Sequence, residues 1–217
     1  MKKIVLLLFI PFFLFGQTIN KKDVFGNKQG YWEKKYKNGS IRYSGNFIDD
    51  IPINFFYYYY KTGELKVEKR FFHLGKVAAT HIFYKSGELK ASGIYVDELR
   101  DSTWNYFSKD SILVMSEQYV KGDLNGLTKT YYYEGQLFEV KNWIKNIAEG
   151  KYIQHFKNGK VKIEAIFSKG KKNGQHRSFY PDGSLNCIGL YSDDERLGSW
   201  KFFNNKGVID TIIYYDE

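Results

Sequence analysis

The sequence has little of what marks several common protein classes. It contains one cysteine, Cys187, which excludes an internal disulfide framework and a cysteine-rich metal site. The apolar run near its start, Ile4 to Gly16, has 13 residues, fewer than the roughly 20 that a membrane-spanning helix needs. With 43% hydrophobic and 26% charged residues, the chain fits neither a disordered protein nor a multispanning membrane protein.

Aromatic residues and glycine are abundant instead. Phe, Trp and Tyr make up 19% of the chain, with 19 Tyr and 18 Phe, and 20 glycines accompany only three prolines. Aromatic side chains favour half-buried strands and glycines mark turns. This composition therefore indicates an all-β fold.

Residues 1–17 are predicted to be a secretory signal peptide. Lys2 and Lys3 precede the apolar run, and a short charged start before such a run is typical of export signals. We expect cleavage near Gly16–Thr18; an uncleaved anchor or a buried strand is the alternative. No cysteine follows the run, so a lipid anchor is not supported. Removing the two lysines lowers the formal net charge from +9 to +7, which leaves a basic mature chain.

The strongest signal is an internal repeat of 24 residues that runs without a gap from Gly30 to the C-terminus. Three columns of equivalent positions carry it. The first is a glycine column: Gly39, Gly63, Gly87, Ser111, Gly135, Gly159, Gly183 and Gly207. Two residues later every copy is aliphatic: Ile41, Leu65, Leu89, Leu113, Leu137, Val161, Leu185 and Ile209. Eight residues after the glycine column every copy is aromatic: Phe47, Phe71, Tyr95, Tyr119, Trp143, Phe167, Tyr191 and Tyr215.

Each repeat is predicted to be a β-hairpin. Asn-Gly at 38–39 and 158–159 and Asp-Gly at 182–183 are favoured hairpin turns, because both residues tolerate φ > 0. A two-residue turn at 38–39 sets these cross-strand pairs: Lys37 with Ser40, Tyr36 with Ile41, Trp32 with Gly45 and Gly30 with Phe47.

The same register places a small residue opposite the aromatic column in every copy. These residues are Gly30, Asn54, Ala78, Ser102, Gly126, Gly150, Gly174 and Gly198. We interpret this column as room for a large ring that covers its small cross-strand neighbour.

Eight hairpins give about sixteen short strands, and consecutive hairpins most simply pair side by side. The predicted fold is all-β: about eight tandem hairpin repeats in one long, twisted antiparallel sheet, each repeat advancing about 9–10 Å. Residues 1–17 are the signal peptide, 18–29 a lead-in, and 30–217 a single repeat domain.

The pattern G-x-W-x-x-Y-x-x-G-x-L followed by G-x-Y resembles the MORN-repeat group, and more closely the bacterial variant found in YwqK-type antitoxins. The segments that carry the resemblance are GYWEKKYKNGSIRYSGNF, GKYIQHFKNGKVKIEAIF, GQHRSFYPDGSLNCIGLY and GSWKFFNNKGVIDTIIYY. It covers residues 30–217 and implies a non-enzymatic interaction surface, linked in family members to membrane attachment, scaffolding or toxin neutralisation. The copies at 78–95 and 102–119 depart from the pattern, and an export signal conflicts with a cytosolic antitoxin role.

Six consecutive rings, Phe55 to Tyr60, form the most unusual short stretch. Strand alternation sends the even-numbered three to the face of the repeat core and the odd-numbered three to the opposite face. Tyr59 belongs to a mostly aromatic column on that opposite face: Lys35, Tyr59, Phe83, Phe107, Tyr131, His155, Phe179 and Phe203.

The candidate binding residues are therefore Tyr57, Tyr59, Phe83, Phe107, Tyr131, Phe179 and Phe203. Two interpretations stay open. These rings form a second core, covered by curl of the sheet or by another copy, or an exposed ladder for a partner protein, glycan or lipid.

Nothing in the sequence predicts catalysis, a cofactor or a metal site. No G-x-G-x-x-G, Walker-type loop, G-x-S-x-G or H-E-x-x-H occurs, and the four histidines fall at unrelated repeat positions: His73, His81, His155 and His176. Cys187 occupies a core-face position, so we expect a small buried residue rather than a nucleophile. The acidic pairs 49–50 and 193–194 lie between hairpins.

Lysines cluster modestly in the sixth repeat. We expect four of them beside His155 on the face opposite the core, and three more in the next turn: Lys151, Lys157, Lys160 and Lys162, then Lys169, Lys171 and Lys172. A solvated strand face explains them, and attraction to anionic lipid or envelope polymer is the alternative.

The sequence thus predicts an exported, non-enzymatic repeat protein, periplasmic or secreted, whose sheet surface binds a protein partner. The first alternative is an antitoxin that neutralises a toxin in the cytoplasm. The second is a structural protein at an envelope or membrane surface. No nucleic acid and no cofactor is expected, and the partner's identity and the oligomeric state stay open.

Overall fold

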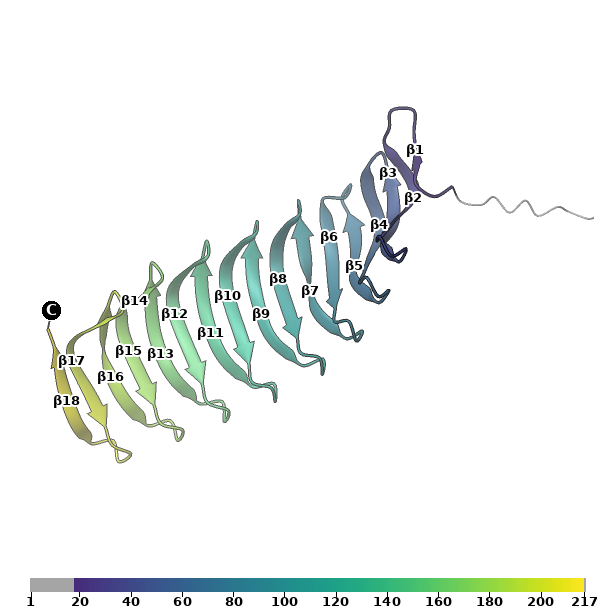
Figure 1. Cartoon of the computed structure of the whole chain (residues 1–217). Helices are drawn as coiled ribbons and strands as arrows, with labels where there is room; N and C mark the ends of the chain where they lie inside the picture. Colours follow the sequence, from purple (N-terminus) through teal and green to yellow (C-terminus); the bar gives the residue numbers. More distant parts are fainter. Residues whose placement is uncertain (1–17, 217) are drawn as a thin grey trace, which may run out of the picture.

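A computed structural model describes residues 18–216, so the predicted signal peptide lies outside the described residues. The described chain forms one antiparallel sheet of 18 strands in which neighbours in sequence are neighbours in space. Figure 1 shows the strands side by side from β2 at one end to β18 at the other, with the two ends far apart. The prediction of an all-β fold with tandem hairpins in one long sheet is confirmed.

The strands are short and regularly spaced. Their bounds are β1 Lys21–Lys22, β2 Lys28–Lys35, β3 Ile41–Ile48, β4 Ile51–Tyr59, β5 Leu65–Phe72, β6 Val77–Phe83, β7 Leu89–Val96, β8 Leu99–Phe107, β9 Leu113–Val120, β10 Asp123–Tyr131, β11 Leu137–Ile144, β12 Ile147–His155, β13 Val161–Ser168, β14 Lys171–Lys172, β15 Gly174–Phe179, β16 Leu185–Ser192, β17 Glu195–Phe203 and β18 Ile209–Tyr215. The lead-in adds β1, which pairs with β2. Residues 18–216 contain no helix that is long and apolar enough to span a membrane.

The predicted register around the aromatic column holds in all eight hairpins, beginning with Gly30 opposite Phe47. The interpretation of the small column was wrong, because a Cβ built on Gly30 meets no atom within 4 Å. The column is small for a backbone reason. Seven of its eight residues have a positive φ, including Asn54 at 56° and Ser102 at 58°, and only Ala78 does not. Left-handed backbone favours glycine and tolerates few other residues.

These left-handed residues belong to β-bulges between successive hairpins. In β4 the pairing with β3 moves from Ile53 opposite Asn46 to Phe56 opposite Gly45, so two residues of β4 are extra. The pairing of β5 with β6 has no such shift. The turn before β6 has four residues, 73–76, instead of two. The two additional residues therefore lie in the turn and not in a bulge.

The predicted turn within each hairpin was wrong in detail. Ile41 pairs with Lys35 rather than with Tyr36, so the loop is longer by one residue. Gly39 is left-handed, with φ +87°, and its amide donates to the carbonyl of Tyr36 at 3.0 Å, whereas Asn38 is not left-handed. This is a three-residue hairpin loop that ends in a left-handed glycine.

The tight turns are those between successive hairpins, at the opposite ends of the strands. In the acidic pairs 49–50 and 193–194 both residues have a positive φ, as two-residue hairpin turns require. The carboxylate of Asp50 accepts a bond from the amide of Lys28 at 3.0 Å, and Asp194 makes the equivalent bond at 2.8 Å. Both pairs therefore serve as turn residues, and residues 18–216 contain no cluster of His, Cys, Asp and Glu that could hold a metal ion.

Tyrosine side chains connect neighbouring hairpins near the loops that end in a left-handed glycine. The hydroxyl of Tyr84 donates to the carbonyl of Phe107 at 2.8 Å. The same bond, at 2.7 to 2.9 Å, recurs at five positions related by the repeat, which we call the tyrosine rungs: Tyr36, Tyr60, Tyr84, Tyr132 and Tyr180. The rungs add side-chain bonds between hairpins to the backbone bonds of the sheet.

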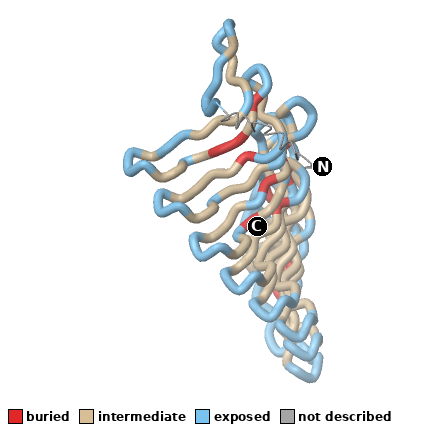
Figure 2. The backbone as a smooth tube through the Cα atoms, turned by 90° about the vertical axis from the view of Figure 1, so that its right-hand side faces the viewer, coloured by how far each residue is buried: buried red, intermediate tan, exposed pale blue. Residues whose placement is uncertain are grey.

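The two faces of the sheet differ in burial. Pairing places Trp32, Phe47 and their equivalents on one face, which we call the ring face, and the alternate residues on the reverse face. Every buried side chain in the described part of the chain lies on the ring face, with the exception of Ser44. Figure 2 shows the buried segments within the sheet and the exposed turns along its edges.

Large rings on the ring face lie over glycines of the preceding hairpin. Trp200, only 1% exposed, covers Gly189, and Trp104 repeats the arrangement over Gly93; a Cβ added to either glycine would overlap the indole. The indole nitrogen of Trp200 donates to the carbonyl of Leu190 at 3.0 Å. A sheet with a single layer thereby obtains a core from side chains folded across its own surface.

Candidate interaction surface

Six of the seven candidate binding residues, all except Tyr57, occupy one repeated position at the ends of strands. We call these six rings the aromatic row: Tyr59, Phe83, Phe107, Tyr131, Phe179 and Phe203. Each is the last residue of its strand, and each pairs across the hairpin with the aliphatic column, as Phe107 pairs with Leu113. All six are half-buried. The structure thus places a ring at the same position in six of the eight hairpins, at one end of the strands on the reverse face.

Tyr57 does not belong to this row. It stacks on Phe55 in the middle of the reverse face, with the ring centroids 6.1 Å apart and the planes at 9°. The guanidinium of Arg70 lies 5.6 Å from the centroid of Phe55. On the other side of the same strand, Phe56 is 3% exposed and packs edge to face with Phe47 at 5.0 Å. The aromatic run is therefore one strand with a buried face and a stacked, solvent-facing one.

Exposed aliphatic side chains accompany these rings on the reverse face, and sequence reasoning missed them. Apart from Ile213, every exposed large hydrophobic residue within a strand occupies a reverse-face position. The central ones are Phe55, Ile94, Ile166 and Leu190, from 36% to 47% exposed. A period-two pattern indicates which strand residues share a face, but it does not show which face is the buried one.

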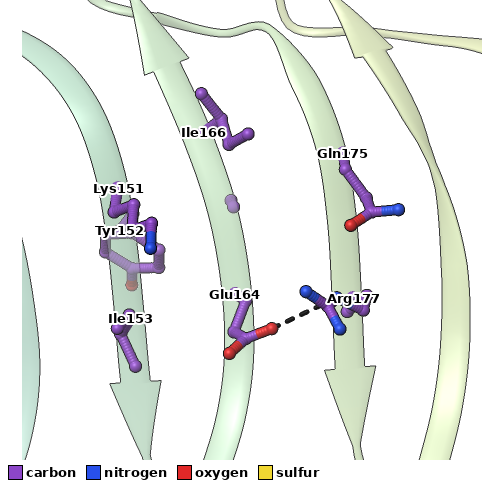
Figure 3. Close-up of a pocket in the computed structure, with 8 residues that line it drawn as sticks. Lys151, Tyr152, Ile153, Glu164, Ile166, Gln175 and Arg177 are labelled. Atoms are coloured by element: carbon purple, nitrogen blue, oxygen red, sulfur yellow. Dashed lines mark ion pairs between the residues drawn. The ribbon is translucent and has the colours of Figure 1, made fainter.

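A shallow cavity of about 130 Å³ opens on the reverse face over β12, β13 and β15. Figure 3 shows Lys151, Glu164, Ile166 and Arg177 around it. The Nε atom of Arg177 lies 3.2 Å from a carboxylate oxygen of Glu164, an ion pair between two neighbouring strands. The cavity therefore has an apolar wall and charges of both signs.

The predicted lysine cluster divides between several places. Lys151 lies on the reverse face, where it pairs with Ile166. Lys157 forms an ion pair with Glu134 at 2.9 Å in the turns. Lys172 pairs with Phe167 and so belongs to the ring face. The structure therefore does not gather these lysines into one patch.

The other residues singled out from the sequence have structural surroundings. Cys187 is buried on the ring face, as predicted, with its sulfur 3.0 Å from the hydroxyl of Ser178. His176 is buried between the rings of Tyr191 and Trp200. Burial, and then the nearby charges of Lys172 and Arg196, lower the pKa of His176 to about 4.

Fold and surface together define an open β-hairpin repeat protein that exposes large apolar residues, among charged ones, on its reverse face. The chain contains a MORN repeat variant, because residues 148–169 and 172–193 each match the model of that family. The two matches coincide with the hairpins β12–β13 and β15–β16, which hold the cavity of Figure 3. MORN repeats are generally binding modules for proteins or membranes and not catalysts. No curated protein matches the chain.

Proposed function

We propose that this protein is an exported, non-enzymatic scaffold that binds a protein partner through its reverse face. One observation carries the proposal. In a sheet with a single layer, one face takes nearly all the buried side chains, while the other exposes large apolar residues and the half-buried aromatic row. Large apolar residues gathered and exposed on one face are typical of interaction sites.

The repeat supports this use because it presents similar side chains at regular intervals. The rings of the aromatic row occupy this position in six of the eight hairpins, about 10 Å apart where the hairpins are neighbours, with His155 between Tyr131 and Phe179. The tyrosine rungs fix the backbone of the row, since their acceptors include the carbonyls of Tyr59, Phe83 and Phe107. A rigid row of anchors loses little conformational freedom on binding.

The test is a double variant, Tyr59→Ser with Phe107→Ser, whose two sites lie two repeats apart and act nearly independently. The partner is first identified by crosslinking in the native host, and its affinity is then measured with purified proteins. Each interfacial ring contributes about 2 kcal/mol or more at a hot spot, so the affinity falls by well over tenfold. Lys61→Ser with Lys109→Ser, in turns of the same two repeats, is the matched control and leaves affinity nearly unchanged.

Stability measurements on the same variants separate binding from packing. Truncation of rings in a second core costs about 3–5 kcal/mol each. A double variant that melts far below the native protein therefore contradicts the partner surface. A double variant with a nearly native melting temperature and weak binding supports it.

Export is part of the proposal and has its own test. A charged start and a 13-residue apolar run support cleavage near Thr18. N-terminal sequencing of the protein from its native host measures this directly. An intact Met1 in a cytosolic fraction refutes export, and it favours the antitoxin alternative, whose partner is a toxin in the cytoplasm.

A further inference from the structure

The two edges of the described sheet are protected differently. At the N-terminal edge the lead-in covers β2. Lys21 and Lys22 pair with β2, and the amide of Asn20 donates to the carbonyl of Tyr31 at 3.0 Å. The side-chain oxygen of Asn20 also accepts a bond from the amide of Glu33 at 2.8 Å. A short edge strand with lysines is a common protection against pairing with another chain.

The other edge, β18, lacks such a cover within residues 18–216. Its neighbour there is β17 alone, and Figure 1 shows it as the last strand of the sheet. Six of its seven residues are exposed, and its one charged residue is Asp210. Four apolar or aromatic side chains are 40% to 77% exposed: Ile209, Ile212, Ile213 and Tyr214. An exposed apolar edge strand is a site for pairing with another strand.

The repeat shows that the free side of β18 has the form of a pairing edge. β18 is equivalent to β16, because Ile209 lies 24 residues after Leu185. On the corresponding side β16 pairs with β17, between Cys187 and Ser192. Both strands have the same shift of register beside the preceding loop, and in β16 it does not prevent pairing with the next strand.

The side chains of β18 restrict the kind of strand that fits. In β16, Gly189 lies under Trp200, and a Cβ on this glycine would overlap the indole. The equivalent residue of β18 is Ile213, whose side chain branches at Cβ. A strand that brings a large ring to this position therefore clashes. Longer side chains at this position pair with threonine in two of three hairpins: Lys69 with Thr80, Glu117 with Thr128, and Lys141 with Tyr152.

Head-to-tail stacking of two copies meets two obstacles. The strand that would follow β18 in such a stack is β2, whose Trp32 is equivalent to Trp200 and would lie against Ile213. The lead-in also occupies the edge of β2. The arrangement of two copies that avoids both obstacles is two-fold, with β18 antiparallel to β18.

Antiparallel pairing of β18 with its own copy has a register that suits its side chains. With Ile212 on the two-fold axis, Thr211 lies opposite the second copy's Ile213, and Asp210 lies opposite its Tyr214. The residues of each pair belong to the same face of the sheet, since 211 and 213 lie on the ring face and 210, 212 and 214 on the reverse face. The pairing places a threonine beside Ile213 and opposes no like charges.

The neighbouring register, centred on Ile213, is less favourable. It places Asp210 opposite the second copy's Asp216, and like charges directly opposite each other destabilise a strand pair. It also places Ile213 opposite itself instead of opposite a threonine.

We propose that β18 binds β18 of a second copy, in the antiparallel register centred on Ile212, and joins the two chains into one continuous sheet. The two-fold axis is perpendicular to the sheet, so both reverse faces lie on the same side. The partner surface proposed above then extends over two copies. The pairing uses the edge of the sheet and not its reverse face, so the failure of either proposal leaves the other intact.

The first measurement is sedimentation equilibrium of the purified protein over a range of concentrations. Monomer and dimer are expected without larger species, because a two-fold contact is closed. The decisive variant is Ile212→Glu. Within one chain the new carboxylate faces Lys201 of β17, whereas in the dimer two carboxylates lie opposite each other. The dissociation constant of the dimer is expected to rise by about tenfold or more.

The matched control is Ile166→Glu. Ile166 is 42% exposed on the reverse face, close to the 40% of Ile212, and it faces Lys151 on a neighbouring strand. Its strand, β13, has neighbours on both sides. This variant is expected to change the dissociation constant less than about twofold. Melting temperatures confirm that both variants are folded.

Crosslinking tests the register. In a Cys187→Ser background, Ile212→Cys places two thiols opposite each other on the axis, and oxidation with diamide is expected to give a covalent dimer. Ile209→Cys is the control on the same strand, because its two copies are about 20 Å apart in this register. A disulfide requires Cα atoms within about 7 Å.

Four results overturn the proposal. They are a monomer at every concentration, a dissociation constant that Ile212→Glu leaves unchanged, a loss in Ile166→Glu as large as in Ile212→Glu, and oligomers that keep growing with concentration. Loss in Ile166→Glu alone assigns the contact between copies to the reverse face. A disulfide that forms as fast in Ile209→Cys as in Ile212→Cys refutes the register.

Discussion

The ring face and the reverse face belong to the same strands, and both carry many aromatic side chains. On the ring face, rings pack edge to face at about 5 Å, as between Tyr191 and Trp200. On the reverse face, Phe55 and Tyr57 stack on each other in contact with solvent. The difference comes from small residues. Gly93 and Gly189 leave room for an indole to lie across the ring face, and the reverse face has no such glycine. Burial here is decided by the neighbouring strand and not by residue type.

The largest difference in stability between the two faces is expected when one ring is removed from each face in turn. Trp104→Ala empties the fully buried position over Gly93 and is expected to cost about 3–5 kcal/mol. Phe55→Ala, at a position 39% exposed, is expected to cost about 1 kcal/mol or less. Urea unfolding followed by circular dichroism measures both. Similar losses in the two variants contradict the assignment of the core to one face.

The second test uses the buried histidine of the ring face. The pKa of His176 is about 4 in the folded chain and about 6.5 in the unfolded one. Between these values the unfolded state binds more protons, so stability is intact above about pH 6.5 and falls as the pH is lowered towards 4. From pH 7.5 to 5 we expect a loss of about 2 kcal/mol from this group.

Two variants isolate that contribution. His176→Phe keeps a ring between Tyr191 and Trp200 but has no proton to bind, so this part of the pH dependence disappears. His73→Asn, in an exposed turn, leaves it unchanged. The measurement is the unfolding free energy at a series of pH values. A native slope in His176→Phe refutes the assignment.

A third test sharpens the comparison between two kinds of glycine. Gly189→Ala places a methyl group against Trp200 and is expected to cost about 2–3 kcal/mol through overpacking. Gly159 has φ +82° with no atom within 4 Å of an added Cβ, so Gly159→Ala costs only its backbone strain, about 1 kcal/mol. Melting temperatures rank the two variants, and the reverse order contradicts the packing of the indole.

The smallest effect is expected at the tyrosine rungs. Tyr84→Phe removes the bond to the carbonyl of Phe107 and is expected to cost about 1 kcal/mol. Tyr57→Phe is the control, because the Tyr57 hydroxyl makes no hydrogen bond with the described residues, and it is expected to be nearly neutral. Native-state hydrogen exchange at the boundary between these hairpins measures the difference. Equal protection in both variants contradicts a role for the rungs.

Much of the fold could be predicted because each set of equivalent positions in the repeat reflects one local requirement of the backbone or of side-chain packing. The register around the aromatic column was correct in all eight hairpins, since a glycine or small residue lies opposite every aromatic. The reason given for it was wrong. A small residue meets either a steric or a backbone requirement, and Ser102, with φ 58°, shows that backbone conformation decided here. The pair Asn38-Gly39 led to a predicted loop that was one residue too short. Asn-Gly also suits a longer loop in which only the glycine is left-handed.

The candidate site was predictable in its periodicity and not in its surroundings. The aromatic row recurs at the predicted positions, and a column of tyrosines three residues before the glycines could also have been read from the sequence. The acceptors of those tyrosines could not, because each bond joins two hairpins. The exposed aliphatic residues could not be predicted either, because their exposure depends on which face lets side chains pack across neighbouring strands.

The sequence by itself determined the 24-residue period, the hairpins, the pairing of strands and the two sets of alternating side chains. These follow from local rules, namely strand alternation and the left-handed backbone that glycine permits. Only the tertiary structure decided which set is buried, where bulges replace longer turns, and how Trp200 comes to lie over Gly189. Each of these depends on contacts between neighbouring hairpins, and a single repeat does not contain its own neighbour.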